Sequence, residues 1–117
     1  MSGRRLTVHV LDTAAGLPAA GLDLTLERLD DAGGRTLLAR VRTNDDGRSD
    51  APLLAGAAML PGVYEITYDV GAWQRRRGVP PGFYETIPLR IRVTDDTAHV
   101  HVPLLLSPFG YTTYRGS

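Results

Sequence analysis

Short segments in which apolar and polar residues alternate run through most of the chain. In the segment "RLTVHVL", Leu6, Val8 and Val10 share one face of an extended chain. Thr7 and His9 share the opposite face. This period of two is typical of a β-strand with one buried face. The pattern predicts strands over residues 5–11, 21–29, 36–43, 61–70, 87–93, 99–106 and 110–115.

Turn-forming residues separate these segments. The cluster "DDAGGR" at 30–35 predicts that residues 21–43 form a hairpin. Residues 71–78 break the alternation and predict a helical turn or a basic loop, whereas residues 51–60 predict a connecting loop or a short helix. About eight short strands at hairpin spacing indicate an all-β sandwich with Greek-key or similar connections. The length predicts a single domain over residues 1–117.

The composition narrows the possible chemistry. The 117 residues include 13 cationic side chains, all of them arginine, and 13 acidic ones, with no cysteine. The lack of lysine and cysteine excludes Schiff-base catalysis, disulfides and thiolate chemistry. The balanced charge predicts no attraction to nucleic acid or to an anionic membrane surface. Because no apolar stretch near the start is long enough for a signal peptide or a membrane span, we expect a cytoplasmic protein.

Three histidines are the first candidates for chemistry. They are His9, His99 and His101, and the last two are spaced so that both point to the same side of one strand. The residues alone leave three interpretations open: ordinary part-buried histidines, a three-imidazole zinc site, or general acid–base groups that titrate near neutral pH. No carboxylate at ligand spacing supports the zinc site.

The arginines are ambiguous on the same basis. Arg48 follows an Asn-Asp-Asp-Gly turn, and Arg75–Arg77 form a run of positive charge beside Trp73. By itself, each of these features predicts a solvated surface, with Trp73 as a packing anchor. The sequence contains no nucleophile elbow, phosphate loop or dinucleotide fingerprint. Residue patterns alone therefore predict a β-sandwich with a few suggestive polar side chains.

Three motifs extend this interpretation. The segment "HVHVPLLLSPFGYTTYRGS" resembles the closing signature of the 5-hydroxyisourate hydrolases, the transthyretin-like enzymes of urate breakdown. "LTVHVLDTAAGLPAAGLDLTLERL" resembles the opening block of that family, and "TNDDGR" resembles its middle block. The three motifs occur in the family's order, and the resemblance covers essentially the whole chain. The terminal Tyr-Arg-Gly-Ser separates these hydrolases from transthyretin, the hormone carrier with the same fold.

The resemblance implies a transthyretin-like β-sandwich of two sheets, with about eight strands and one short helix. It also implies a homotetramer, built as a dimer of dimers, with active-site clefts at the dimer–dimer interface. The implied activity is hydrolytic opening of the lactam ring of 5-hydroxyisourate, with no metal and no other cofactor. The implied catalytic residues are His9, Arg48, His101 and Ser117. The implied substrate-binding residues are His9, Arg48, Tyr114 and Arg115.

The same resemblance implies a mechanism. The imidazole of His9 or His101 would accept a proton from water, while Arg48 would hold the substrate and stabilise the oxyanion. Tyr114 would contact the substrate ring, and Ser117 would orient His101 or the water. Which histidine is the base stays open.

Two positions depart from the family pattern. Val100 stands between the paired histidines where the family usually has tyrosine, and Thr112 replaces a serine. A side chain at position 100 faces away from the imidazoles on a strand, so we expect a change in packing only. The role of His99 stays open. The alternative function is a transthyretin-like protein that binds a small ligand in an inter-subunit channel without catalysis.

Overall fold

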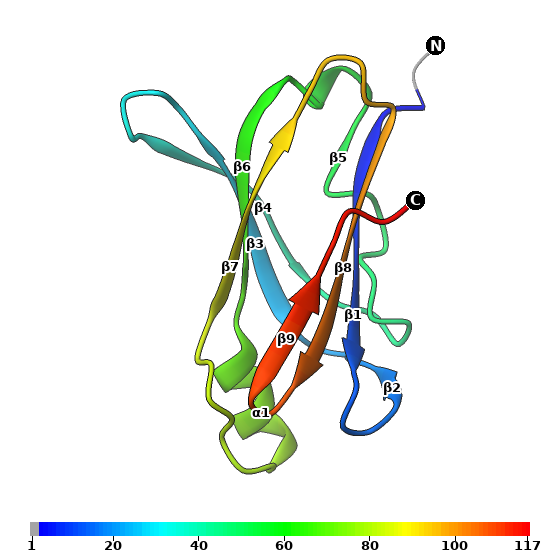
Figure 1. Ribbon diagram of the computed structural model, residues 1–117, viewed down its shortest axis with the longest axis vertical. Helices are drawn as coiled ribbons and strands as arrows, with labels where there is room; N and C mark the ends of the chain where they lie inside the picture. The colour runs from blue at the N-terminus through cyan, green and yellow to red at the C-terminus, as the bar shows by residue number, and fades with distance from the viewer. Residues whose placement is uncertain (1–2) are drawn as a thin grey trace.

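The protein is a two-sheet β-sandwich, described by a computed structural model over residues 3–117 (Figure 1). One sheet has the strand order β2-β1-β8-β9, with β5 also paired to β1, and the other has the order β4-β3-β6-β7. The strands are β1 (Arg5–Asp12), β2 (Leu17–Pro18), β3 (Asp23–Leu29), β4 (Arg35–Arg42), β5 (Leu54–Ala55), β6 (Gly62–Tyr68), β7 (Ile87–Val93), β8 (His99–Ser107) and β9 (Gly110–Thr113). The predicted all-β sandwich is confirmed.

The strand predictions hold with small shifts at their ends. β3 and β4 pair antiparallel, so the predicted hairpin over residues 21–43 is confirmed. The predicted strand 110–115 is too long, because β9 ends at Thr113 and the chain then turns so that the Gly116 N–H reaches the His101 carbonyl at 2.8 Å. The two-residue strands β2 and β5 were not predicted, since so short a segment shows no alternation.

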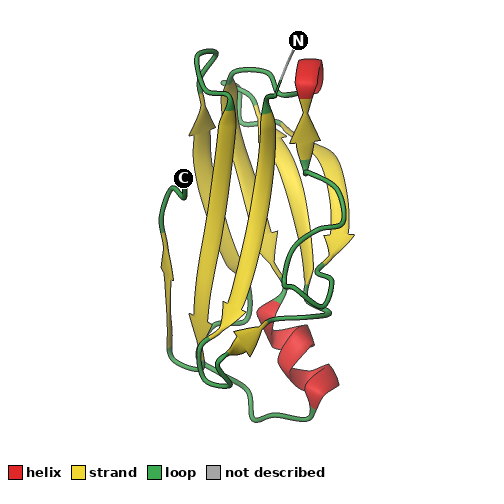
Figure 2. Ribbon diagram, turned by 90° about the vertical axis from the view of Figure 1, so that its right-hand side faces the viewer, coloured by secondary structure: helices red, strands yellow, loops and turns green. Residues whose placement is uncertain are grey.

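The two ends of the chain meet in one sheet. β1 and β8 pair in parallel over their whole length, and this pairing places Thr7 opposite His101 and His9 opposite Pro103. Figure 2 shows these long strands side by side on one face of the sandwich. Because parallel neighbours need a long connection, the intervening segments build the second sheet before the chain returns.

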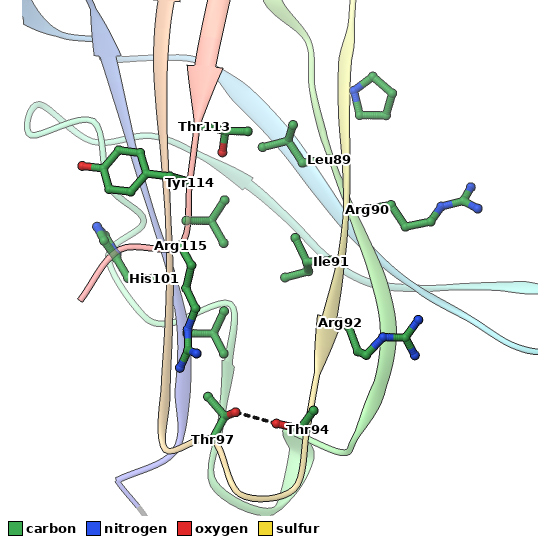
Figure 3. Close-up of a pocket in the computed structure, with 13 residues that line it drawn as sticks. Leu89, Arg90, Ile91, Arg92, Thr94, Thr97, His101, Thr113, Tyr114 and Arg115 are labelled. Carbon is green, nitrogen blue, oxygen red and sulfur yellow. Dashed lines mark hydrogen bonds between the residues drawn. The ribbon is translucent and has the colours of Figure 1, made fainter.

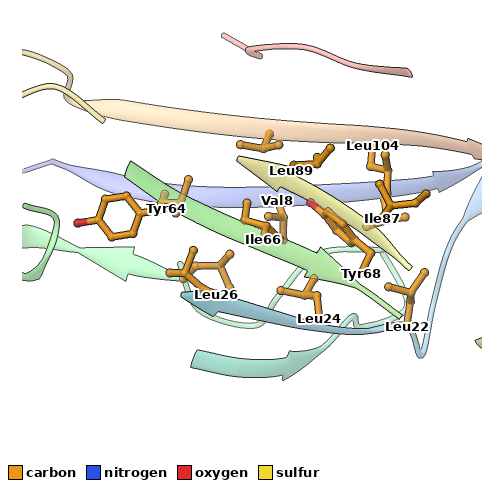
Figure 4. Close-up of a cluster of buried hydrophobic side chains, with 14 of the residues drawn as sticks. Val8, Leu22, Leu24, Leu26, Tyr64, Ile66, Tyr68, Ile87, Leu89 and Leu104 are labelled. Carbon is orange, nitrogen blue, oxygen red and sulfur yellow. The ribbon is translucent and has the colours of Figure 1, made fainter. Parts of the chain in front are cut away.

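The core lies between the sheets and follows the alternation in the sequence. Leu6, Val8 and Val10 of β1 are buried, and Tyr64 and Tyr68 of β6 meet them from the opposite sheet (Figure 4). The polar positions between them face outward. Packing of the two inner faces therefore fixes which side chains each sheet presents to its outer surface.

One helix closes an end of the sandwich. The α-helix α1 (Val70–Arg77) begins after Asp69, whose carboxylate accepts a hydrogen bond from the backbone of the first turn, and ends at Gly78, which adopts φ 68°. The indole N–H of Trp73 donates to the Ala20 carbonyl at 2.9 Å. Residues 71–78 thus form a helix rather than a basic loop, and Trp73 is the packing anchor that the sequence predicted.

The basic run on this helix is engaged in structural contacts. Arg75 forms an ion pair with Glu85 at 2.9 Å. Arg77 stacks over the ring of Trp73 with its guanidinium 4.7 Å from a ring centroid. The ion pair with Glu85 links the helix to the segment that follows it, whereas the stacking of Arg77 on Trp73 lies within the helix. The segment 51–60 contains β5 and a short 3₁₀-helix over Gly56–Ala58, which agrees with the predicted short helix.

The helices were also compared with the requirements of a membrane span. Neither helix within residues 3–117 has the length and apolar character that crossing a bilayer requires.

Candidate active site

The three histidines gather on the outer face of the β1–β8 pair. Leu6 and Val8 point into the core, so the intervening Thr7 and the following His9 point outward. The same alternation in β8 turns His99 and His101 outward, and buries Val100 between them. The prediction that residue 100 faces away from the imidazoles is confirmed.

The parallel register brings these outward side chains together. The ring centroids of His9 and His101 lie 6.5 Å apart, and those of His99 and His101 lie 6.0 Å apart. The hydroxyl of Thr7 lies between two rings, 2.9 Å from His99 Nε2 and 2.8 Å from His101 Nδ1. Three imidazoles and one hydroxyl therefore form a continuous polar cluster.

A tight turn delivers Arg48 to this cluster. The side-chain oxygen of Asn44 accepts hydrogen bonds from the backbone N–H groups of Asp46 and Arg48, and Gly47 adopts φ 75°. The Gly47 carbonyl accepts a hydrogen bond from the Val10 N–H at 2.8 Å, which fastens the turn to β1. A Cβ at position 47 would collide with the Val10 carbonyl, so this approach requires glycine. The turn that contains the "DGR" motif is thus fastened to β1 at Gly47, and it presents an exposed Arg48 beside the cluster.

The C-terminal residues close the other side of the cluster. Gly116 pairs with His101 through an isolated β-bridge, and a Cβ on Gly116 would lie 2.6 Å from Cδ2 of the His101 ring. Ser117 then lines a pocket of about 410 Å³ together with Arg48 and His101. Thr7 and His99 line the same pocket. Ser117 is therefore part of the pocket wall beside His99 and His101.

The environment favours neutral imidazoles. Burial and the positive charge of Arg48 lower the pKa of His101 below its ordinary value, and the neighbouring His99 and His9 add to this effect. Burial and Arg48 also lower the pKa of His9, although a hydrogen bond with the Asp46 backbone opposes them. A neutral imidazole beside a fixed guanidinium can accept a proton near neutral pH.

Two predicted substrate-binding residues lie in a neighbouring pocket. Tyr114 and Arg115 line a cavity of about 500 Å³ between β7 and the β8–β9 pair, and His101 lines both this cavity and the one beside Arg48. Figure 3 shows Arg115 extending along this cavity toward Thr97. Within one chain, the fold thus brings together His9, Arg48, His101 and Ser117. The pocket lined by Tyr114 and Arg115 shares only His101 with this group.

Sequence reasoning missed the role of Thr7 as a bridge. The alternation in β1 already places its hydroxyl on the same face as His9, but nothing in the sequence indicates that β8 lies next to β1. The bridge to His99 and His101 exists only through that pairing. Within residues 3–117, no group of three or more His, Cys, Asp or Glu side chains is arranged to hold a metal ion.

The fold and this cluster define a β-sandwich protein that carries a group of three imidazoles on the outside of one sheet. Residues 6–116 match the model of the HIUase/Transthyretin family. The chain belongs to this family.

Individual relatives cover the whole domain. The chain is 52% identical to a 5-hydroxyisourate hydrolase 2 of Rhizobium meliloti, over 97% of this chain and 96% of that protein. The solved structure of a 5-hydroxyisourate hydrolase from Klebsiella pneumoniae matches with a TM-score of 0.81 at 32% identity, over 100% of this chain and 96% of that one. A transthyretin from Sparus aurata matches with a TM-score of 0.87 at 30% identity, over 96% of each chain. The resemblance to 5-hydroxyisourate hydrolases is confirmed.

Proposed function

We propose that this chain is a single-domain hydrolase that opens the lactam ring of 5-hydroxyisourate in urate catabolism. The product is 2-oxo-4-hydroxy-4-carboxy-5-ureidoimidazoline. One observation carries the proposal: Arg48, His101 and Ser117, from three separate parts of the sequence, line one pocket on the outer face of β1 and β8, and the ring of His9 lies 6.5 Å from that of His101. Relatives that are named 5-hydroxyisourate hydrolases and match nearly the full length support the choice of substrate.

The first step is attack by water on the lactam carbonyl carbon. A neutral imidazole, of His9 or His101, accepts one proton of the water as the oxygen–carbon bond forms. Negative charge then develops on the carbonyl oxygen. The guanidinium of Arg48, which has only donors to offer and keeps its charge at any working pH, stabilises that oxyanion.

The second step breaks the ring. The carbon–nitrogen bond of the tetrahedral intermediate cleaves, the leaving nitrogen takes the proton held by the imidazolium, and a carboxyl group remains on carbon. The imidazole returns to its neutral state, so no other reactant is consumed. Ser117 orients His101 or the attacking water, while Tyr114 and Arg115 contact the substrate ring.

The proposed assembly is a homotetramer, a dimer of dimers, with the active sites at the dimer–dimer interface. Its location is the cytoplasm. The polar cluster lies on an outer sheet face rather than inside the sandwich, so a second subunit packed against that face would enclose the substrate and exclude water.

A coupled assay tests the activity. Urate oxidase generates 5-hydroxyisourate from urate, and the ultraviolet absorbance of 5-hydroxyisourate is followed with and without this protein. We expect the protein to accelerate the decay, and His9→Ala and His101→Ala each to slow turnover by about 10²–10⁴-fold, the usual contribution of a general base. Circular dichroism of each variant controls for the fold.

The alternative is a carrier without catalysis, favoured by the likeness to the transthyretin of Sparus aurata. A folded native chain that leaves the decay rate unchanged would contradict the hydrolase proposal. Near-normal turnover in both histidine variants would instead contradict the assigned roles. Turnover that survives exhaustive chelation would leave no role for zinc.

A further inference from the structure

We infer that Thr7 and His99 are positioning residues, which hold His101 in the tautomer that presents a bare Nε2 to the pocket. The inference deepens the proposed function, and it rests on that proposal in giving His101 the role of base. Neither residue belongs to the catalytic set that the sequence motifs imply.

The geometry is a hydrogen-bonded bridge. The Thr7 hydroxyl lies 2.8 Å from Nδ1 of His101 and 2.9 Å from Nε2 of His99, and both are hydrogen-bonding distances. The two rings follow one another on the outer face of β8, and Thr7 lies opposite His101 in the parallel register. The bridge therefore depends on backbone pairing and not on a mobile loop.

Counting hydrogens restricts the bridge to two arrangements. A threonine hydroxyl has one hydrogen to donate and two lone pairs that accept. Because the two rings are the only partners of the Thr7 hydroxyl among the described residues, in the neutral cluster it donates to one ring and accepts from the other. In the first arrangement, His101 Nδ1–H donates to Thr7 and the Thr7 hydroxyl donates to His99 Nε2. In the second, both bonds reverse, and His101 then carries its hydrogen on Nε2.

Arg48 favours the first arrangement. Nδ1 of His101 is occupied by Thr7, so Nε2 is the ring nitrogen left for the pocket that Arg48 also lines. A guanidinium carries a positive charge and offers only hydrogen-bond donors. An imidazole N–H that pointed toward the guanidinium would therefore be repelled. A bare Nε2 is also the form that can accept a proton from water.

The bridge keeps its direction during the reaction. When Nε2 of His101 accepts a proton, Nδ1–H still donates to Thr7, and the Thr7 hydroxyl still donates to His99. The ring thus holds its orientation while its charge changes. His9, Arg48 and His99 are the charged or titratable groups that act on it, and Arg5 and Asp50 line the same pocket.

Nitrogen NMR of the histidine rings tests the tautomer without any substrate. Protonated and bare ring nitrogens of a neutral imidazole differ strongly in chemical shift, and the three histidines can be assigned by single substitutions. We expect His101 of the native protein to be protonated on Nδ1, and Thr7→Val to mix its tautomers. Protonation of His101 on Nε2 in the native protein would overturn the inference, whatever the enzyme's activity.

Kinetics test the same bridge by a second route. Thr7→Val removes the hydroxyl from a side chain of similar shape, and we expect kcat to fall by about 10- to 100-fold, a part of what a general base contributes, with KM little changed. Thr7→Ser keeps a hydroxyl and should restore most of the rate. Thr25→Val on β3 makes the same exchange on the other sheet and should leave both constants unchanged.

A double-mutant cycle separates the bridge from ordinary packing. His99→Phe removes the acceptor of the Thr7 hydroxyl, which is then free to donate to His101 Nδ1, so this variant should also lose kcat and shift His101 toward the Nε2–H form. Because both changes act on one bridge, the double variant should lose no more than the worse single variant. Additive losses, or a normal kcat in Thr7→Val, would overturn the inference. Failure of the native protein to hydrolyse 5-hydroxyisourate would instead contradict the proposed function, and the NMR result would still decide the tautomer.

Discussion

At the scale of single residues, Arg48 acts on the histidines through its charge. Its guanidinium lowers the pKa of both His9 and His101, second only to burial. A base with a lowered pKa is neutral over a wider pH range, and its activity falls only when the pH drops through that lowered value. The turn that Gly47 fastens to β1 therefore places a charge that adds to the effect of burial on both imidazoles.

This charge effect predicts a pH profile. The acid limb of kcat/KM in the native enzyme should lie below pH 6.5, the ordinary value for histidine. In Arg48→Gln, the acid limb of the residual kcat/KM should move to higher pH, toward 6.5. The positive charge is then gone, while burial still lowers the histidine pKa. Arg48→Lys should lower turnover, since it lacks the planar fork, but should keep the limb near its native position. An unshifted limb in Arg48→Gln would contradict the electrostatic role.

A second residue-scale prediction concerns the core. Tyr68 is fully buried, burial raises the pKa of its phenol, and the hydroxyl has no hydrogen-bond partner among the described residues. An unpaired buried hydroxyl costs about 1–3 kcal/mol. Tyr68→Phe should therefore raise the free energy of unfolding, by about 1 kcal/mol, in urea denaturation.

Tyr64 on the same strand supplies the matched control for this prediction. Its hydroxyl accepts a hydrogen bond from Arg28 at 2.7 Å and donates one to the Leu60 carbonyl at 2.6 Å. Tyr64→Phe leaves those partners unpaired and should lower the free energy of unfolding. Equal losses of stability in Tyr64→Phe and Tyr68→Phe would show that the Tyr68 hydroxyl is satisfied after all.

At the scale of elements, the alternating pattern decides what each strand shows to solvent. It was enough to predict that Leu6 and Val8 are buried and that His9 is not. It was not enough to place β1 beside β8, because the partners of a strand depend on packing across the whole chain. The bridge from Thr7 to His101 was invisible for that reason, since threonine in a strand is unremarkable by itself.

The outer face of the other sheet contains a charge cluster that joins its strands. Glu65 of β6 is nearly buried and accepts hydrogen bonds from Arg35 of β4 at 2.8 Å and Arg90 of β7 at 3.1 Å. The hydrogen bond from Arg35 is the main cause that lowers the pKa of Glu65. One carboxylate thus links three strands.

This cluster predicts a pH-dependent stability difference. Glu65→Gln should lower the free energy of unfolding at pH 7 by about 1 kcal/mol, the typical net value of a hydrogen bond. Because the folded-state pKa is lowered, the stabilisation is present above the ordinary value of 4.5 and is lost as pH falls through the lowered pKa. The native protein and the variant should therefore converge in urea denaturation at acid pH.

Glu85→Gln is the control for the charge cluster. Its ion pair with Arg75 is exposed, with side-chain accessibilities of 65% and 61%, and exposed pairs contribute little to stability. We expect almost no change in this variant at either pH. A loss as large as that of Glu65→Gln would mean that burial does not distinguish the two carboxylates.

At the scale of the whole molecule, the sequence predicted the architecture better than the connections. Strand periodicity and turn residues indicated an all-β sandwich, whereas the break at residues 71–78 left a helical turn and a basic loop both open. The sheet order did not follow, because alternation identifies the buried face of a strand but not its neighbours. The candidate site shows the same division. Family motifs selected His9, Arg48 and His101, and only the fold explains why these residues lie near one another.

The proposed assembly is the remaining property of the whole molecule. Leu105 points outward from β8, on the same face as His101, and pairs with Leu11 of β1, so partly exposed apolar side chains lie beside the polar cluster. If that face packs against another subunit, Leu105→Glu would place a charge in the contact and should dissociate the tetramer in analytical ultracentrifugation. Hydrolysis of 5-hydroxyisourate should fall with it, since each site would lose its covering subunit.

A leucine on the opposite sheet provides the comparison for this last test. Leu38→Glu on β4 adds the same charge at an exposed leucine of the sheet that does not contain β1 and β8, and it should change neither mass nor activity. A Leu105→Glu protein that is dissociated yet fully active would mean that one chain forms a complete site. A native protein that sediments as a monomer at all concentrations would contradict the proposed tetramer, and the open face of β1 and β8 would then be the working surface of a single chain.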